Sequence, residues 1–197
     1  YYQKLDKKKY SNMILFNKNI IISTLTTHIE LRKIPKIISN KEFLYNQLLN
    51  LYQTLKIDFN IKYPKIIMSG LNPHAGENGK IGTEEGNSII PIINKLKRKG
   101  IKINGPSSAD SLLINKNLKK YHCFIFMYHD QALIPFKYIS QFTGVNYTGN
   151  LDIIRTSPDH GTAYDLIGSK KISNLSFLNC FKLIKKINKN RKMNVKG

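Results

Sequence analysis

Short runs of apolar residues alternate along this chain with longer stretches in which apolar residues recur at helical spacing. The short runs are rich in β-branched and aromatic residues and end at turn residues, so they predict buried strands. These strands are expected at residues 20–25, 65–69, 101–103 and 123–128. The longer stretches predict helices at residues 41–56, 84–99 and 109–120, and Gly100 is typical of a residue that ends the second one. Strands that alternate with helices predict an α/β fold whose mostly parallel sheet is covered on both faces.

The last stretch, residues 173–189, has five apolar residues on roughly one face and predicts a packed terminal helix. They are Leu175, Leu178, Phe181, Ile184 and Ile187. No acidic residue follows Asp165, whereas nine Lys or Arg do. We interpret this excess as a solvated basic face, in preference to a nucleic-acid-binding arm.

The composition bounds the class of protein. With 197 residues, of which 41% are hydrophobic, the chain can bury a core as one domain or two small ones. No apolar run approaches the roughly 20 residues that cross a bilayer, and the first residues do not resemble a signal peptide, so we expect a cytoplasmic protein without a membrane partner. Two cysteines, Cys123 and Cys180, are too few for a disulfide framework.

The net charge of +20 arises from 32 Lys and Arg against 12 Asp and Glu. Such a balance indicates a polyanionic partner in some proteins. Here the lysines are scattered among Ile and Asn, which is typical of compositional drift, and we expect no nucleic-acid partner. Acids that persist in such a chain are candidates for chemistry. Seven of them share four short segments with most of the histidines and glycines: Glu77, Glu84, Glu85, Asp110, Asp130, Asp159 and Asp165.

Three histidines lie just beyond the carboxyl ends of predicted strands: His28, His74 and His129. In open α/β sheets this edge binds ligands, so the three imidazoles are expected on one rim. Imidazole is a common ligand of Zn, Mn, Co and Ni ions, and three such ligands leave positions open for substrate oxygens. Each histidine could instead be a core or capping residue that makes one hydrogen bond. The shared placement of the three favours a metal site.

Other polar residues near these histidines suit the same site. Asp130 and Asp110 are placed to orient an imidazole or to contact a metal and a substrate amine, although Asp110 could equally cap a helix. Lys137 and Arg155 are candidates for binding a phosphate or carboxylate, or are ordinary surface cations.

Two segments have compositions that suit close contact with a ligand. The segment 70–86 has five glycines, which suits tight turns and close approach to an anion or substrate. The segment 159–168 could wrap an adenine-ribose group or form a tight turn, and the sequence leaves both open.

Five segments resemble, in order and spacing, the signature segments of the 4-hydroxythreonine-4-phosphate dehydrogenase (PdxA) family. They are GLNPHAGENGKIGTEE, NGPSSAD, MYHDQALIPFKY, GVNYT and IIRTSPDHGTAYDLIG. The resemblance implies a three-layer α/β/α fold similar to isocitrate and isopropylmalate dehydrogenases, and a homodimer with the active site at the subunit interface. Members of this family are longer, so we expect this chain to lack the amino-terminal part. The resemblance places the metal- and substrate-binding α/β region in residues 1–150 and a segment of the cofactor-binding domain in residues 151–197.

The resemblance also implies roles for individual residues. A divalent cation (Zn, Mg, Mn, Co or Ni) would be bound by His28, His74 and His129, with the candidate catalytic residues Asp110 and Asp130 near it. The phosphorylated amino-acid substrate would be bound by Lys137, Asn146 and Arg155. NAD or NADP would be bound by His160, Gly161, Thr162, Ala163 and Asp165.

The implied reaction is the oxidation of 4-phosphooxy-L-threonine by NAD(P)+ in the synthesis of pyridoxal 5'-phosphate, a form of vitamin B6. The product, 2-amino-3-oxo-4-phosphooxybutanoate, then loses carbon dioxide to give 3-amino-2-oxopropyl phosphate. In this reaction a divalent ion would act as a Lewis acid. The alternative is a truncated, inactive remnant that keeps the metal-binding and dimer surfaces.

Overall fold

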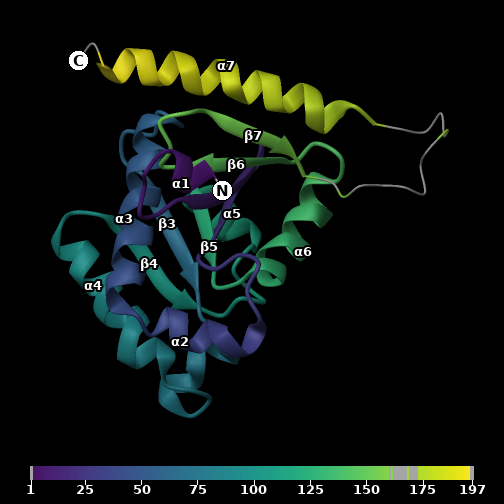
Figure 1. Cartoon of the computed structure of the whole chain (residues 1–197). Coiled ribbons are helices and arrows are strands. Elements are labelled where there is room, and N and C mark those ends of the chain that lie inside the picture. Colours follow the sequence, from purple (N-terminus) through teal and green to yellow (C-terminus); the bar gives the residue numbers. More distant parts are fainter. Residues whose placement is uncertain (1, 160, 162–167, 169–172, 196–197) are drawn as a thin grey trace.

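The computed structural model describes residues 2–159, 161, 168 and 173–195 (Figure 1). Its helices are α1 (Tyr2–Leu5), α2 (Ile34–Ile38), α3 (Lys41–Ile57), α4 (Ile90–Arg98), α5 (Asn115–Lys120), α6 (His129–Ser140) and α7 (Leu175–Val195). Its strands are β1 (Asn12–Asn17), β2 (Ile20–Thr24), β3 (Lys65–Ser69), β4 (Lys102–Ser107), β5 (Cys123–Phe126), β6 (Val145–Gly149) and β7 (Arg155–Pro158). The described residues also form two 3-10 segments, η1 (Leu31–Lys33) and η2 (Pro73–Gly79), and one π-helical turn, η3 (Glu85–Ile89).

Within the described residues the strands form one seven-stranded sheet in the order β4-β3-β5-β2-β1-β6-β7. The first four are parallel neighbours, as the alternation of strands and helices predicts. The sequence pattern did not predict β1, β6 and β7, which add an antiparallel half to the sheet. The chain passes from this half to the parallel half through a hairpin turn between β1 and β2, where the amide of Asn19 donates to the side chain of Asn17 over 2.7 Å.

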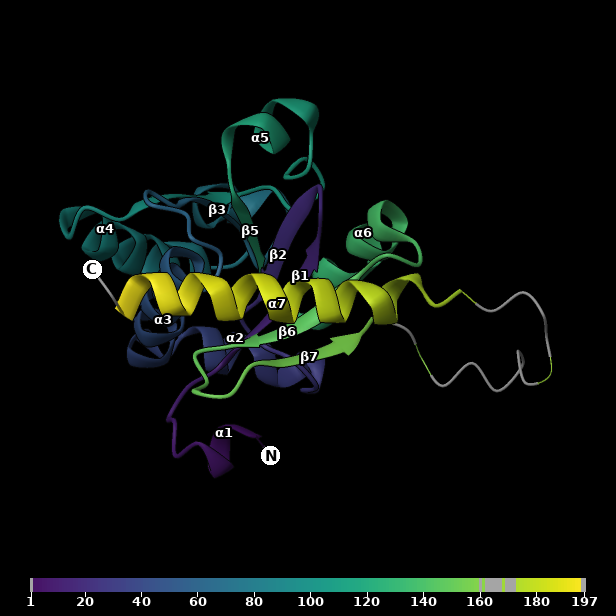
Figure 2. The same cartoon turned by 90° about the horizontal axis from the view of Figure 1, so that it is seen from above.

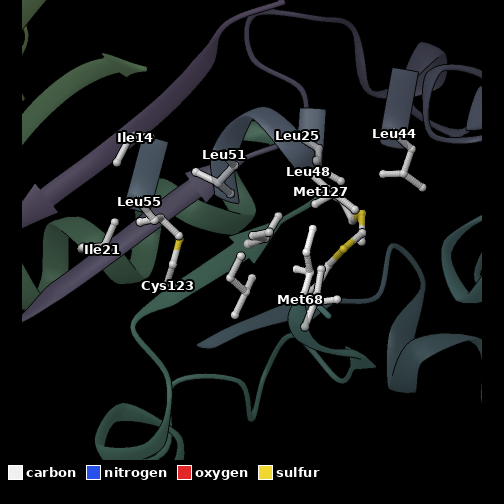
Figure 3. Packing of buried hydrophobic residues seen from close by; sticks show 14 of the residues in the cluster. Ile14, Ile21, Leu25, Leu44, Leu48, Leu51, Leu55, Met68, Cys123 and Met127 are labelled. Carbon is white, nitrogen blue, oxygen red and sulfur yellow. The ribbon is translucent and has the colours of Figure 1, made fainter. Parts of the chain in front are cut away.

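Helices cover both faces of the sheet, which confirms the three-layer prediction. On one face α2, α3, α4 and α7 contribute residues such as Ile38, Leu96 and Leu183 to one apolar cluster. Figure 3 shows the α3 side chains Leu51 and Leu55 in this cluster. On the other face α6 and the residues before α5 form a second cluster, with Leu112, Leu133 and Phe136 at its centre. Successive residues of β2 alternate between the clusters, as in any strand buried on both faces.

The terminal helix α7 crosses the sheet beside β6 and β7 (Figure 2). Its predicted apolar face was wrong in detail, because Leu175, Leu178 and Phe181 are exposed. The residues that it buries recur at steps of three and four along another face. They are Ser176, Cys180, Leu183, Ile187 and Asn190. The polar members of this face bind loop backbone, so apolar periodicity alone does not identify it: Ser176 donates to the carbonyl of Gly144, and Asn190 to that of Asp58.

The other predicted helices are present with changed limits. Residues 41–56 match α3, and α4 ends just before Gly100, whose φ of +80° suits a glycine after a helix. The predicted helix at 109–120 begins only at Asn115, because residues 110–113 form turns. Among the described residues, β7 and α7 join the same sheet and core as the rest, and the boundary at residue 150 stays a prediction. No described helix is long and apolar enough to span a membrane.

Candidate functional site

The three predicted metal ligands lie beyond the carboxyl ends of three neighbouring parallel strands. His28 follows β2, His129 follows β5 and His74 follows β3, and these strands are adjacent in the sheet. The prediction that the three histidines share one rim of the sheet is therefore confirmed. Whether they converge depends on the loops that carry them.

His28 and His129 do converge. The centroids of their rings are 5.3 Å apart, and Nδ1 of His129 lies 2.7 Å from the Asp130 carboxylate. A carboxylate only accepts hydrogen bonds, so Nδ1 of His129 carries the proton and the lone pair is on Nε2. Asp130 thus occupies the position from which it would orient a ligand imidazole, as the sequence suggested.

His74 lies in an unusual loop. Residues 74–78 all have left-handed backbone conformations, with φ between 42° and 79°. Only glycine adopts this conformation without cost, and here it supplies one of the five positions, Gly76. A Cβ on Gly76 would lie 2.7 Å from Oε2 of Glu85, so this position also excludes larger residues on steric grounds.

His74 and His28 line different cavities. His74 lines a cavity of about 350 Å³ together with Asp110, Tyr128 and Gln131, whereas His28 lines a different one. No group of three His, Cys, Asp or Glu among the described residues of one chain could hold a metal ion. One chain therefore supplies a converging histidine pair, and His74 does not complete a group of three ligands with it among the described residues. Asp110 does not cap a helix, since the residue that precedes α5 is Ile114.

A buried carboxylate holds the loop in place. Glu85, which is 4% exposed, accepts the amide N–H groups of Leu71 and Asn72, each over 2.8 Å, and the side-chain amide of Asn72 over 2.9 Å. The same Asn72 amide donates to Glu84, and this hydrogen bond lowers the pKa of the Glu84 carboxyl. Glu85 belongs to a π-helical turn, a rare form that is frequently found at functional sites.

We expect Glu85→Gln to loosen the His74 loop. A glutamine side chain retains one acceptor oxygen but loses the charge and presents an NH₂ group toward the Asn72 amide, which should cost about 1–3 kcal/mol of local stability. Hydrogen–deuterium exchange should accelerate in residues 70–82 and remain unchanged in β5. The matched control is Glu84→Gln, whose carboxylate is less buried; equal effects of the two substitutions would contradict a special role for Glu85.

Gln131, on the first turn of α6, ties this loop to the strand that precedes His129. Its side-chain oxygen accepts the N–H of Met127 over 2.8 Å and the hydroxyl of Ser69 over 3.1 Å. Its amide donates to the carbonyl of Gly70 over 3.2 Å. One side chain therefore fixes the ends of β3 and β5 relative to each other.

The His28 cavity, of about 400 Å³, gathers further predicted residues. Asn146 and Arg155 line it, although they come from β6 and β7, more than 100 residues beyond His28. The strand register explains this: Thr24 of β2 pairs with Met13 of β1, which pairs with Thr148 of β6, which pairs with Arg155 of β7. Residues in one such row point to the same face of a sheet.

Arg155 is the cation of this cavity. Its Nη1 donates to the hydroxyl of Thr148 over 3.2 Å, and its guanidinium lies over the ring of Tyr2, 5.4 Å from the centroid. Sequence reasoning missed Thr24 and Thr148, which line the cavity beside it. The hairpin turn after β1 could have indicated the antiparallel half of the sheet. Which residues lie side by side across the strands depends on the strand register, which the sequence pattern does not give.

The remaining predicted residues are not assembled into this cavity. Lys137 is exposed on α6, about 12 Å along the helix axis from His129. Of the predicted cofactor residues, Gly161 is described and exposed. His160, Thr162, Ala163 and Asp165 lie outside the described residues.

Comparison with known proteins agrees with this architecture. The model of a family described as "Pyridoxal phosphate biosynthetic protein PdxA" matches residues 1–184. Two curated relatives are named 4-hydroxythreonine-4-phosphate dehydrogenase. The one from Bacteroides thetaiotaomicron is 41% identical over 175 residues, which are 89% of this chain and 48% of the relative. The one from Aquifex aeolicus is 41% identical over 87% of this chain and 52% of the relative.

A solved structure gives the same result for the fold. The crystal structure of 4-hydroxythreonine-4-phosphate dehydrogenase from Klebsiella pneumoniae superposes with a TM-score of 0.82 at 30% identity, over 94% of this chain and 56% of that one. The chain therefore spans about half the length of the curated relatives it matches.

Proposed function

The chain belongs to the PdxA family, and on this premise we propose that it carries the metal- and substrate-binding part of a 4-hydroxythreonine-4-phosphate dehydrogenase of vitamin B6 synthesis. The observation that carries the proposal is the cavity in which His28 meets Asn146 and Arg155. It joins a candidate metal ligand to a cation and an amide in one chain. Such an arrangement suits a small anionic substrate whose reacting group lies next to a metal.

The histidine pair would hold the divalent cation. Two imidazoles with converging rings suit Zn, Mn, Co or Ni, and the Asp130 contact fixes the tautomer of His129. When bound, such an ion supplies Lewis-acid polarisation of the substrate oxygen. The chain's own contribution is to present Nε2 of His129 and to hold its proton at Nδ1.

A second copy of the chain would complete the metal site. One chain brings two imidazoles together, and no group of three candidate ligands converges among its described residues, so a second chain would supply the third histidine. We therefore propose a homodimer with the active site at the subunit interface. His74 and Asp110 of one chain would then face the histidine pair of the other.

Substrate binding would depend on Arg155. Its planar guanidinium can bind a phosphate or carboxylate through two parallel N–H bonds, and its contacts with Thr148 and Tyr2 hold it at the cavity. Asn146 and Lys137 would provide further contacts. NAD or NADP would be bound by residues 160–165.

The proposal is tested by metal-dependent oxidation of 4-phosphooxy-L-threonine, followed as NADH or NADPH formation. The assay would use this chain alone and a chimera in which the rest of the Aquifex aeolicus relative is added. Activity that requires both metal and cofactor would support a dehydrogenase. No activity in either protein, with metal binding intact, would favour the alternative of an inactive remnant.

We expect Arg155→Met to weaken binding of 4-phosphooxy-L-threonine by about 10- to 100-fold, because it removes a charge-assisted pair of hydrogen bonds. Arg155→Lys keeps the charge without the bidentate geometry and should lie between wild type and Arg155→Met. Isothermal titration measures both affinities. The control is Arg98→Met, which removes an exposed arginine at the end of α4. Equal affinities in wild type and Arg155→Met would contradict the assignment.

A further inference from the structure

Two buried oxygens at the His28 cavity have no hydrogen-bond partner among the described residues. One is Oγ1 of Thr24, in a side chain that is 3% exposed, and the other is Oδ1 of Asn146. Both residues line the cavity. Buried polar atoms in folded proteins are nearly always paired, so each exception needs an explanation.

The neighbouring hydroxyl groups are hydrogen-bonded, in contrast to that of Thr24. Ser23 precedes Thr24 in β2, and its hydroxyl donates to the carbonyl of Met13 over 2.9 Å. Thr26 follows, and its hydroxyl donates to the carbonyl of Met127 over 2.7 Å. The chain therefore satisfies the hydroxyl of Ser23 and that of Thr26, which also lines the cavity, whereas the hydroxyl of Thr24 has no partner among the described residues.

The chemistry of the cavity indicates what these oxygens would bind. Arg155 provides the positive charge and attracts the anionic group of a ligand. Among the described residues of one chain, no lining residue of the cavity is acidic, so a cationic group of the ligand would meet neutral oxygens from this chain. An amide oxygen accepts only, and a threonine hydroxyl can accept as well. Together they suit a group that donates two hydrogen bonds, such as an ammonium.

We propose that Thr24 determines specificity by accepting, together with Asn146, hydrogen bonds from the α-ammonium group of the substrate. Arg155 then binds the anionic end across the same face of the sheet. This inference rests on the proposed function, since it concerns which part of the phosphorylated amino acid the cavity recognises. It assigns a role to a residue of β2 that the sequence pattern places in the core.

The test compares two ligands that differ only in the amine. They are 4-phosphooxy-L-threonine and 3-hydroxy-4-phosphooxybutanoate, and their affinities are measured by isothermal titration on the full chain. We expect wild type to prefer the amine by at least about tenfold, because a site built to accept a hydrogen bond rejects a ligand that lacks the donor. Thr24→Val should reduce this preference by about tenfold, and Thr24→Ser should retain it.

Thermal unfolding distinguishes this role from a structural one. Thr24→Val removes an unpaired buried hydroxyl, so the melting temperature of the free protein should stay within about 2 °C of wild type or rise. The matched control Ser23→Ala removes a paired hydroxyl. It should lower the melting temperature by about 2–4 °C and leave the ligand preference unchanged.

The outcomes separate the two proposals. If neither ligand binds the wild-type chain, the proposed substrate is wrong and the role of Thr24 falls with it. If both ligands bind and the preference for the amine is the same in wild type and Thr24→Val, the proposed function stands and the role of Thr24 is overturned.

Discussion

Replacing His129 by alanine is expected to weaken divalent-metal binding by more than about 100-fold. The histidine pair brings two candidate ligands together, with ring centroids 5.3 Å apart, and no group of three candidate ligands converges in the described part of the chain. Loss of a residue that only orients a ligand costs about 10- to 100-fold in metal affinity. Loss of the ligand itself should cost more, so affinities should follow the order wild type, Asp130→Asn, His129→Ala.

Titration with Co²⁺ and competition with Zn²⁺ against a chromogenic chelator measure these affinities. His28→Ala should match His129→Ala, because each removes one imidazole of the pair. The control is His122→Ala, which removes a histidine whose Nδ1 accepts the backbone N–H of Lys65 and which lies before β5. Metal affinities that remain at the wild-type value in His28→Ala and His129→Ala would exclude the pair as the metal site.

The same variants test the shared site. His74→Ala and His129→Ala should each lose high-affinity metal binding as homodimers. In a hybrid dimer, one of the two sites would combine the intact pair of one chain with the intact His74 of the other. Random mixing should therefore restore about a quarter of the wild-type sites. Absence of any recovery, although hybrid dimers form, would contradict a site shared between two copies.

The sequence allowed the parallel half of the sheet and the positions of its histidines to be predicted. The runs that form β2, β3 and β5 are apolar enough to identify strands, and the direction of parallel strands fixes the edge at which the following residues emerge. The position of His74 within that edge could not be predicted. It depends on a left-handed turn held by Glu85, a carboxylate many residues farther along the chain.

The antiparallel half was not predictable from the pattern for a different reason. Val145–Gly149 has only two apolar side chains, Val145 and Tyr147, and Arg155–Pro158 contains no large apolar residue. These segments are strands because they pair with β1 and with each other. Arg155 was a candidate anion-binding residue from the sequence itself, and Asn146 was identified through the family resemblance. Their proximity to His28 and Thr24 follows from the register of four strands, which local sequence does not encode.

Replacing Arg191 by methionine is expected to destabilise the fold by about 3–5 kcal/mol. Arg191 lies near the end of α7, and its Nε donates to Asp58 over 2.7 Å, where the Asp58 side chain is 4% exposed. Its other nitrogens donate to the hydroxyl of Tyr147 and to the carbonyls of Leu151 and Asp152. The substitution would leave the Asp58 carboxylate buried without its cation.

The pKa directions describe the same cluster. Burial, and then the neighbouring Asp58 charge, raises the pKa of the Tyr147 hydroxyl, so the phenol remains neutral and donates to Asp58. Burial alone lowers the pKa of Arg191, but its hydrogen bond to Asp58 raises it, and the net direction is upward. In the folded state the Arg191 guanidinium therefore stays charged beside Asp58, and the Tyr147 phenol stays neutral.

Urea denaturation measures the decrease in the free energy of unfolding caused by Arg191→Met. The expected decrease is a large part of the roughly 5–15 kcal/mol that stabilises a typical domain. The double substitution Asp58→Asn with Arg191→Met should recover much of it, because no buried charge is then unpaired. Arg98→Met provides the exposed control.

Since Arg191 fixes the loop between β6 and β7, the surviving folded fraction of Arg191→Met should also bind 4-phosphooxy-L-threonine more weakly through Asn146 and Arg155. A loss below about 1 kcal/mol would place this cluster with ordinary surface ion pairs.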